Sequence, residues 1–146
     1  MKYTVSVRTL CEFTAKQGDL DLRFTPAPSA QEGIAGHGTV TSRRASHYQA
    51  EISLAGEYKH LLIRGRADGF DAMQNQLEEI KTFKGDLARM PANHRQLHWA
   101  QLKIYGWLLC QKLELPGIYL ALVYFDIISK QETILKEHYN AKSLKQ

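Results

Sequence analysis

The run IYLALVYF, at residues 118–125, carries no charged side chain, so a strand formed there has two apolar faces to bury. Strands of this kind lie in the interior of sheets that are covered by helices on both sides. Even with Gly117 the run is far shorter than the roughly 20 residues that a helix needs to span a bilayer. We therefore expect a globular α/β domain built around this strand, with no membrane-spanning part.

Hydrophobic periodicity and turn residues divide the rest of the chain into helices and strands. The predicted helices run from a cap at Ser6 to Gly18, from a capping box at Ser29 to about Arg44, and from Pro91 to about Lys112. The predicted strands are 48–54, 61–68, 77–83, 118–125 and 132–139, with residues 55–60 as a turn between the first two. The order α-α-β-β-β-α-β-β predicts an α/β fold with a mixed central β-sheet flanked by helices.

Length and composition restrict the class of protein. The 146 residues are enough for one domain with a substantial core, so we expect residues 1–146 to form a single domain. Cys11 and Cys110 lie far apart without CxxC partners, which argues against a disulfide scaffold or a zinc ribbon. The N-terminal segment lacks the apolar core of a signal peptide, so we expect a cytoplasmic protein. The net charge of +4 mildly favours a polyanionic partner such as nucleic acid.

The stretch GRADGFDAMQNQLEEIKTF, at residues 65–83, places charged groups inside two predicted strands. Residues two apart in a strand share a face, so Glu79 and Lys81 project together while Ile80 points to the other face. The same acid-x-Lys spacing occurs at residues 57–59, in the predicted turn, and chance alone produces it in a chain of this composition. The spacing becomes informative only through its position in the hairpin.

A hairpin centred between Met73 and Gln74 places Asp68 directly opposite Glu79. Two carboxylates that face each other across a strand pair repel, at a cost of about 0.2–1 kcal/mol. A Mg²⁺ ion, which favours one or two carboxylates together with water and phosphate oxygens, would relieve this repulsion. Lys81, beside them, would orient or deprotonate a water molecule, or neutralise charge in a phosphoryl-transfer transition state. The alternative is a solvated hairpin face with ordinary cross-strand ion pairs.

The long helix carries a polar stripe at steps of four, three and four residues: His94, His98, Gln101 and Tyr105. This stripe borders the apolar face that packs on the sheet, so it can line a cleft. There Gln101 and Tyr105 would hold a DNA strand or brace Lys81. The alternative is a boundary stripe that only satisfies polar groups. The His94–His98 spacing also fits a zinc pair, but no further ligand pattern accompanies it.

Asp68, Glu79-x-Lys81 and Gln101-x-x-x-Tyr105, in this order, resemble the PD-(D/E)XK nuclease superfamily and its RecB-like branch. The motifs GRADG, EEIKT and HxxQLxxY look like those of the nuclease domain that precedes iron–sulfur-type DNA helicases. The resemblance implies a restriction-endonuclease-like core. It also implies that the chain is the N-terminal part of a longer, helicase-type protein.

The resemblance implies a site for Mg²⁺ or Mn²⁺. Its ligands would be Asp68, Glu79, the backbone carbonyl of Ile80, and His37 on the first core helix. Several RecB-like nucleases also bind an iron–sulfur cluster through four cysteines, but this chain has two, so we expect no cluster in this domain.

The catalytic residues implied by the resemblance are Asp68, Glu79 and Lys81, with Gln101 and Tyr105 completing the motif. Glu51 falls where members of the family often carry an additional acid close to the metal. The expected activity is metal-dependent hydrolysis of DNA, single-stranded or with single-stranded ends, in repair or recombination near the nucleoid.

Basic residues close to the expected site would neutralise DNA phosphates and make binding salt-dependent. The candidates are Arg64, Arg66 and Lys84, with His98 as a further contact. Arg64 and Arg66 share the face of Asp68, so they are also possible ion-pair partners for it. Two other functions remain open. The first is a catalytically silent DNA-binding or docking module. The second is a Holliday-junction or restriction-type endonuclease, which would be a stable dimer.

Overall fold

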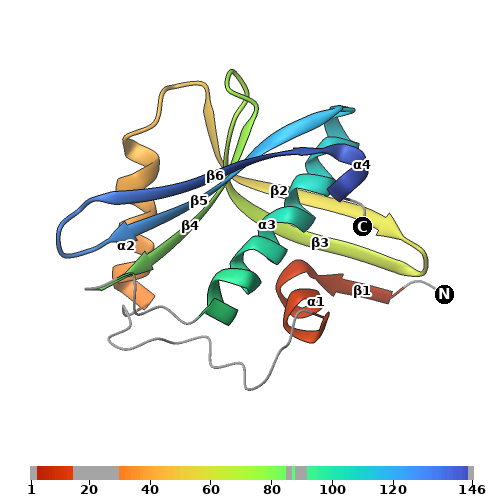
Figure 1. The fold of residues 1–146 in the computed structure, drawn as a ribbon, viewed down its shortest axis with the longest axis horizontal. Helices are drawn as coiled ribbons and strands as arrows, with labels where there is room; N and C mark the ends of the chain where they lie inside the picture. The colour runs from red at the N-terminus through yellow and green to blue at the C-terminus, as the bar shows by residue number, and fades with distance from the viewer. Residues whose placement is uncertain (1–2, 15–29, 85–86, 88–91, 145–146) are drawn as a thin grey trace.

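The computed structural model describes residues 3–14, 30–84, 87 and 92–144 and contains one mixed, six-stranded sheet flanked by helices (Figure 1). The predicted α/β class is therefore confirmed. The elements are β1 (Tyr3–Ser6), α1 (Val7–Thr14), α2 (Ala30–Ser42), β2 (Tyr48–Tyr58), β3 (Leu61–Asp71), β4 (Gln76–Phe83), α3 (Ala92–Leu113), β5 (Gly117–Asp126), β6 (Glu132–Asn140) and α4 (Ala141–Leu144). None of the helices in this described part is long and apolar enough to cross a membrane.

Strand β3 changes partner along one of its edges. On one side it pairs with β2 in an antiparallel ladder that extends over most of its length. On the other side, residues 61–64 pair with β1 in parallel, and residues 69–71 pair with β4 in antiparallel fashion. Between these ladders, residues 65–68 pair with neither described strand on that edge. The sheet therefore has a gap between β3 and β4.

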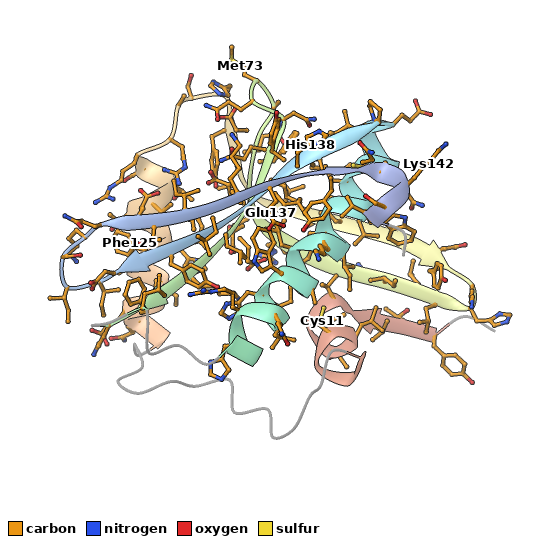
Figure 2. The ribbon with its side chains drawn as sticks, viewed as in Figure 1. Cys11, Met73, Phe125, Glu137, His138 and Lys142 are labelled. Carbon is orange, nitrogen blue, oxygen red and sulfur yellow. The ribbon has the colours of Figure 1, made fainter. Side chains whose placement is uncertain are left out.

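The hairpin register predicted from the sequence is confirmed, but its ladder is shorter than expected. Gly69 pairs with Glu78, as a hairpin centred between residues 73 and 74 requires, and Met73 lies at the tip of the turn (Figure 2). The ladder ends at this pair, so Asp68 and Glu79 are not paired residues of the sheet. The strands diverge there because β4 continues alongside β5, with which it pairs along its whole length.

Two apolar clusters cover the opposite faces of the sheet. Leu122 and Tyr124 of β5 belong to the larger cluster, which includes α1 and α3. Val123 and Phe125 alternate with them along the strand and belong to a smaller cluster with Val40 of α2. Figure 2 shows Phe125 on the side of the sheet nearest α2. The strand is therefore buried on both faces, as its sequence predicts.

Helix α2 lies close to the sheet because a glycine faces it. A Cβ atom at Gly36 would lie 2.5 Å from Cγ2 of Thr82 and 3.2 Å from the ring of Phe125. Glycine lowers helix propensity, but here it lets the helix backbone approach β4 and β5 closely. This approach brings the next residue, His37, to the edge of the gap.

The sequence prediction missed or misplaced several elements. The short strand β1 was not predicted, and the capping box at Ser29 and the helix ends at Gly18 and Pro91 lie outside the described residues. The turn predicted at residues 55–60 is wrong, since β2 continues to Tyr58. Gly56 suggested a turn, but it lies in the strand beneath α3, where a Cβ atom would come within 2.6 Å of Leu108.

A buried ionic network joins the residues after α2 to the sheet. Nε of Arg44 donates to Glu78 at 3.0 Å, and its Nη2 donates to Glu132 at 2.8 Å. The Glu78 side chain, only 3% exposed, also accepts hydrogen bonds from Tyr48 and Gln76. Burial alone would lower the pKa of Arg44, but the hydrogen bonds and charges of Glu132 and Glu78 outweigh burial and raise it.

We expect Arg44→Met to destabilise the domain by about 3 kcal/mol, because it leaves the buried Glu78 carboxylate without its cationic partner. The matched control is Arg43→Met, because Arg43 pairs with the same Glu132 from a more exposed position. Loss of the Arg43–Glu132 pair should lower the free energy of unfolding by less than about 1 kcal/mol. If chemical denaturation shows that the two variants lose equal free energies of unfolding, burial of the network does not contribute to stability.

Candidate functional site: an acidic gap between two strands

Asp68 lies at the point where β3 loses regular pairing on both sides. On the β2 side, the register passes from the pair Ala50–Gly69 to the pair Ile52–Ala67 and leaves out Glu51, whose φ is 55°. On the β4 side, the ladder has already ended. Oδ2 of Asp68 accepts a hydrogen bond from the backbone N–H of Ile80 at 2.7 Å. The carboxylate thus bridges the gap and satisfies an amide that β3 no longer pairs.

Glu79 and Lys81 project together from β4, as their spacing predicts. Nζ of Lys81 lies 3.6 Å from Oε1 of Glu79, whose side chain is 9% exposed, compared with 29% for Lys81. The other oxygen of Glu79, Oε2, is buried and has no hydrogen-bond partner among the described residues. A buried carboxylate oxygen without a partner is costly, so this position calls for a proton or a cation.

Burial raises the pKa of the Glu79 carboxyl well above its ordinary value. The ammonium of Lys81 lowers that pKa, whereas the charge of Asp68 raises it further. The opposed carboxylates predicted from the sequence therefore do interact, although they are not partners in a ladder. Part of the negative charge is offset by Lys81, and the rest remains for a further positive group.

His37 and Glu51 border the same gap from α2 and β2. Nδ1 of His37 lies 3.7 Å from Oδ1 of Asp68. A cavity of about 340 Å³ is lined by His37, Glu51, Asp68 and Ile80, together with Ile34, Gly38, Thr41 and Ala50. The structure therefore brings together four residues that the sequence assigned to one site, each from a different element.

Helix α3 closes the gap from the other face of the sheet. Tyr105, 9% exposed, lies directly against β3, where a Cβ atom at Gly65 would come within 2.6 Å of its ring. Burial raises the pKa of the Tyr105 hydroxyl, and the charges of Glu79 and Asp68 raise it further, so this hydroxyl remains a hydrogen-bond donor. Gln101 is also buried, one helical turn away. Gln101 and Tyr105 of the predicted stripe therefore lie on the buried side of the helix.

Two residues that the sequence did not indicate extend the polar region. The Tyr124 hydroxyl lies 2.9 Å from Nδ1 of His98, and Arg95 stacks 5.9 Å from the Tyr124 ring centroid. Burial lowers the pKa of His98 to about 3, with the charge of Lys81 acting in the same direction, so the imidazole is neutral near pH 7. The sequence does not indicate Tyr124 as a site residue, because it lies in an apolar run and resembles a core residue.

The basic residues predicted near the site differ in their surroundings. Lys84 forms an ion pair with Glu32 of α2 at 2.9 Å. Nη1 of Arg66 lies 4.0 Å from Oε1 of Glu51, and both side chains are largely exposed. Within the described residues, the basic side chain in contact with the Asp68 carboxylate is His37, rather than Arg64 or Arg66.

The donor set fits a hard divalent cation that is bound partly by water. No three side chains of His, Cys, Asp or Glu within the described ranges form a ready-made metal cluster. However, Mg²⁺ and similar ions are held by as few as one or two carboxylates with waters. The unpartnered Oε2 of Glu79, close to the charge of Asp68, is the feature such an ion would satisfy. Asp68, Glu79 and the Ile80 carbonyl would hold it, with His37 at the edge.

Comparison with known proteins identifies a fold but no family. No family model and no curated protein matches the chain. Among solved structures, the crystal structure of SSO0001 superposes with a TM-score of 0.56 at 23% sequence identity, over 99% of this chain and 72% of that chain. At this identity the similarity shows the fold alone, which is the mixed α/β architecture described above.

We expect Glu79→Gln to stabilise the metal-free domain increasingly as the pH rises above 4.5, the ordinary pKa of the carboxyl group. The folded protein retains a proton on Glu79 that the unfolded chain loses near its ordinary pKa of 4.5. Stability of the wild type therefore falls as the pH rises from that value through the raised pKa, whereas the variant lacks this loss. Thermal unfolding in EDTA should show the largest gain at alkaline pH.

The adjacent Glu78→Gln is the control for this measurement. It removes the anion that Arg44 binds and should lower the melting temperature throughout. A Glu79→Gln effect that does not change with pH would contradict the raised pKa.

Proposed function

We propose that this chain is a Mg²⁺- or Mn²⁺-dependent DNA nuclease of the RecB-like PD-(D/E)XK type. The observation that carries the proposal is the buried Oε2 of Glu79, which has no hydrogen-bond partner among the described residues, in a carboxyl group that lies beside Lys81 and is affected by the charge of Asp68. A chain selected only for stability would avoid such a group, because it costs free energy without a bound cation. The order of the motifs along the sequence supports the same assignment.

Hydrolysis of a phosphodiester adds water to phosphorus, breaks a P–O bond to one sugar and leaves a phosphate monoester and a free hydroxyl. The divalent ion, when bound, would polarise the phosphate and lower the pKa of a water molecule. Lys81 would hold the attacking water or neutralise the charge that develops on the phosphate oxygens. Asp68 and Glu79 would bind the ion, and His37 would stand beside Asp68.

Helix α3 would supply hydrogen bonds from the opposite face. Tyr105 keeps its proton and can donate to a phosphate oxygen or to a carboxylate. Gln101 would brace Lys81 or the DNA strand. Placement of both on an α-helix that is packed against the sheet would keep them in fixed positions, as catalysis requires.

A second candidate is a DNA-binding or docking module without turnover. One observation favours it: the described residues contain no group of three metal-ligating side chains. In this case Asp68 would serve only to satisfy the Ile80 amide, and Glu79 would remain protonated. The following two experiments separate the candidates.

We expect Lys81→Gln to reduce cleavage of labelled DNA by about 10²–10³-fold with Mn²⁺ present, because a positively charged donor at the reacting phosphate is lost. The control is Lys59→Gln, which alters the other acid-x-Lys pair in the β2–β3 turn. The rate is measured by gel electrophoresis of single-stranded and duplex substrates. Absence of cleavage with any divalent ion, or equal cleavage by Lys81→Gln, would remove the nuclease assignment.

We expect Asp68→Asn to weaken Mn²⁺ binding by at least about tenfold, because one of two anionic ligands is lost. Isothermal titration calorimetry in buffers of different ionisation enthalpy also counts protons. Because the pKa of Glu79 is raised, binding to the wild type should release protons and strengthen with rising pH. Unchanged affinity in Asp68→Asn would place the ion elsewhere, while Glu57→Gln should bind as the wild type does.

A further inference from the structure

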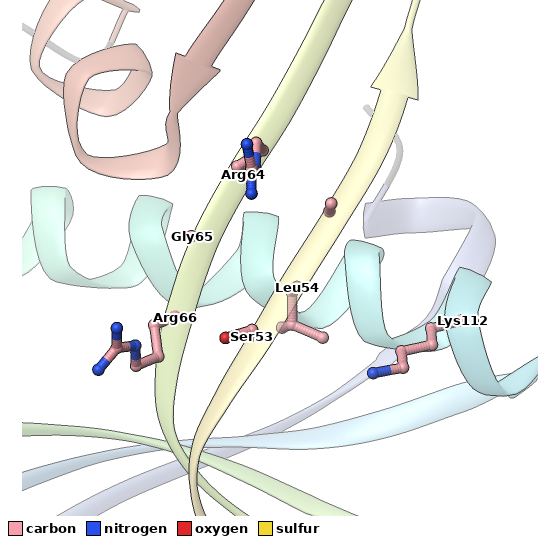
Figure 3. Close-up of a pocket in the computed structure, with 7 residues that line it drawn as sticks. Ser53, Leu54, Arg64, Gly65, Arg66 and Lys112 are labelled. Carbon is pink, nitrogen blue, oxygen red and sulfur yellow. The ribbon is translucent and has the colours of Figure 1, made fainter.

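A basic groove runs along the β2–β3 hairpin, separate from the acidic gap. It has a volume of about 640 Å³ and is lined by Ser53, Leu54, Ala55, Arg64, Gly65, Arg66 and Lys112. Figure 3 shows Arg64 and Arg66 on β3 and Lys112 extending toward β2 from α3. Arg64 and Lys112 form no ion pair within the described part of the chain, so their charges are available to a ligand.

The two arginines of the groove and Asp68 of the gap lie on one face of the same ladder. Ala55 pairs with Arg64, and Ser53 pairs with Arg66. The next position in this series, two residues further along each strand, is Glu51 beside Asp68. At about 3.3 Å per residue, Arg66 lies about 7 Å from Asp68 along β3, and Arg64 about 13 Å. A chain of phosphates that entered the gap would therefore pass over both arginines.

We propose that this groove holds the sugar–phosphate backbone of single-stranded DNA and leads it to Asp68. The inference rests on the proposed function for the substrate class, and adds the path of the strand and the residues that bind it. Guanidinium groups suit phosphate because they donate two hydrogen bonds in one plane. The described residues that line the groove include no aromatic side chain on which bases could stack, so recognition falls on the backbone and is independent of sequence.

The dimensions of the gap favour one strand. Cavities of about 300–1,000 Å³ enclose ligands of small-molecule size. The cavity of about 340 Å³ at Asp68 therefore accommodates a group comparable to one nucleotide, between α2 and the hairpin. A duplex would have to separate its strands before a phosphate could reach the carboxylates.

The exposed carboxylate of Glu51 stands between the groove and the gap. Its Oε1 lies 4.0 Å from Nη1 of Arg66, so it competes with phosphate for this guanidinium. Removal of this charge should therefore strengthen binding of DNA, whereas removal of Arg64 or Lys112 should weaken it. Opposite effects from neighbouring residues are not expected from a general loss of folding.

The test measures fluorescence anisotropy of a labelled oligothymidylate with the whole chain in EDTA, where no cleavage occurs. The double variant Arg64→Ala/Lys112→Ala should bind about tenfold more weakly than the wild type at low salt. The slope of the logarithm of the association constant against the logarithm of the salt concentration should fall in magnitude by about 1.4. This change corresponds to two lost phosphate contacts. Glu51→Gln should bind several-fold more tightly than the wild type.

The charge-matched control is Lys136→Ala/Lys142→Ala, which removes two exposed lysines from β6 and α4. The proposal is overturned if this control and the groove variant lose equal affinity, or if the groove variant binds as the wild type does. Tighter binding of a blunt duplex of the same length would overturn the single-strand path. Thermal unfolding of each variant verifies that all are folded.

The outcome is independent of catalysis. Loss of binding in the groove variant, with no cleavage by the wild type under Mn²⁺, would support the groove and reject the nuclease. Cleavage by the wild type, with unchanged binding and cleavage by the groove variant, would support the nuclease and reject the groove.

Discussion

The change of partner along one edge of β3 is the constraint on which the site depends. β1 and β4 each take one end of this strand, and the middle of the edge pairs with no strand in the described part of the chain. Backbone amides at such an interruption need other acceptors. Asp68 supplies one by accepting the N–H of Ile80, which holds β4 beside β3 after the ladder has ended. One side chain therefore both completes the sheet and brings a negative charge into its interior.

Elements on both faces of the sheet meet at this interruption. Gly36 lets α2 approach from one side, which brings His37 to Asp68, while Gly65 lets the ring of Tyr105 approach from the other. Both contacts depend on the absence of a side chain rather than on a polar interaction. The apolar clusters on the two faces then fix the helices in place. Polar groups from separate segments are therefore held together largely by apolar packing.

Much of the architecture could be predicted because the hydrophobic pattern follows burial closely. The two-sided apolar run became β5, and alternation of Ile63 and Ala67 with charged neighbours located β3. The hairpin register was also predictable, since a short turn fixes it. The end of the ladder at Gly69 was not, because it depends on the path that β4 follows beside β5 on its other edge. The strand β1 was missed because a four-residue segment carries too little pattern.

The residues of the candidate site could likewise be predicted only in part. Asp68, Glu79 and Lys81 could be named because a charged residue within a strand stands out against its neighbours. Tyr124 and Arg95 could not, because Tyr124 meets His98 and Arg95 where β5 packs against α3, a contact that has no counterpart in sequence spacing. Arg44 was predicted only as the end of a helix, and its contacts with Glu78 and Glu132 span distant parts of the chain.

Strand β4 carries two adjacent glutamates with opposite surroundings. Glu78 is saturated with hydrogen bonds on the α2 face, whereas Glu79 is left with an unpartnered oxygen on the α3 face. A slip of β4 by one residue would exchange their faces and would place an apolar residue, Leu77 or Ile80, in one of the two carboxylate positions. Only one of the two positions would then keep a carboxylate. Leu77 and Ile80 belong to the two different apolar clusters and oppose the same slip, so the side chains that bury the strand also set the accuracy of the polar site during folding.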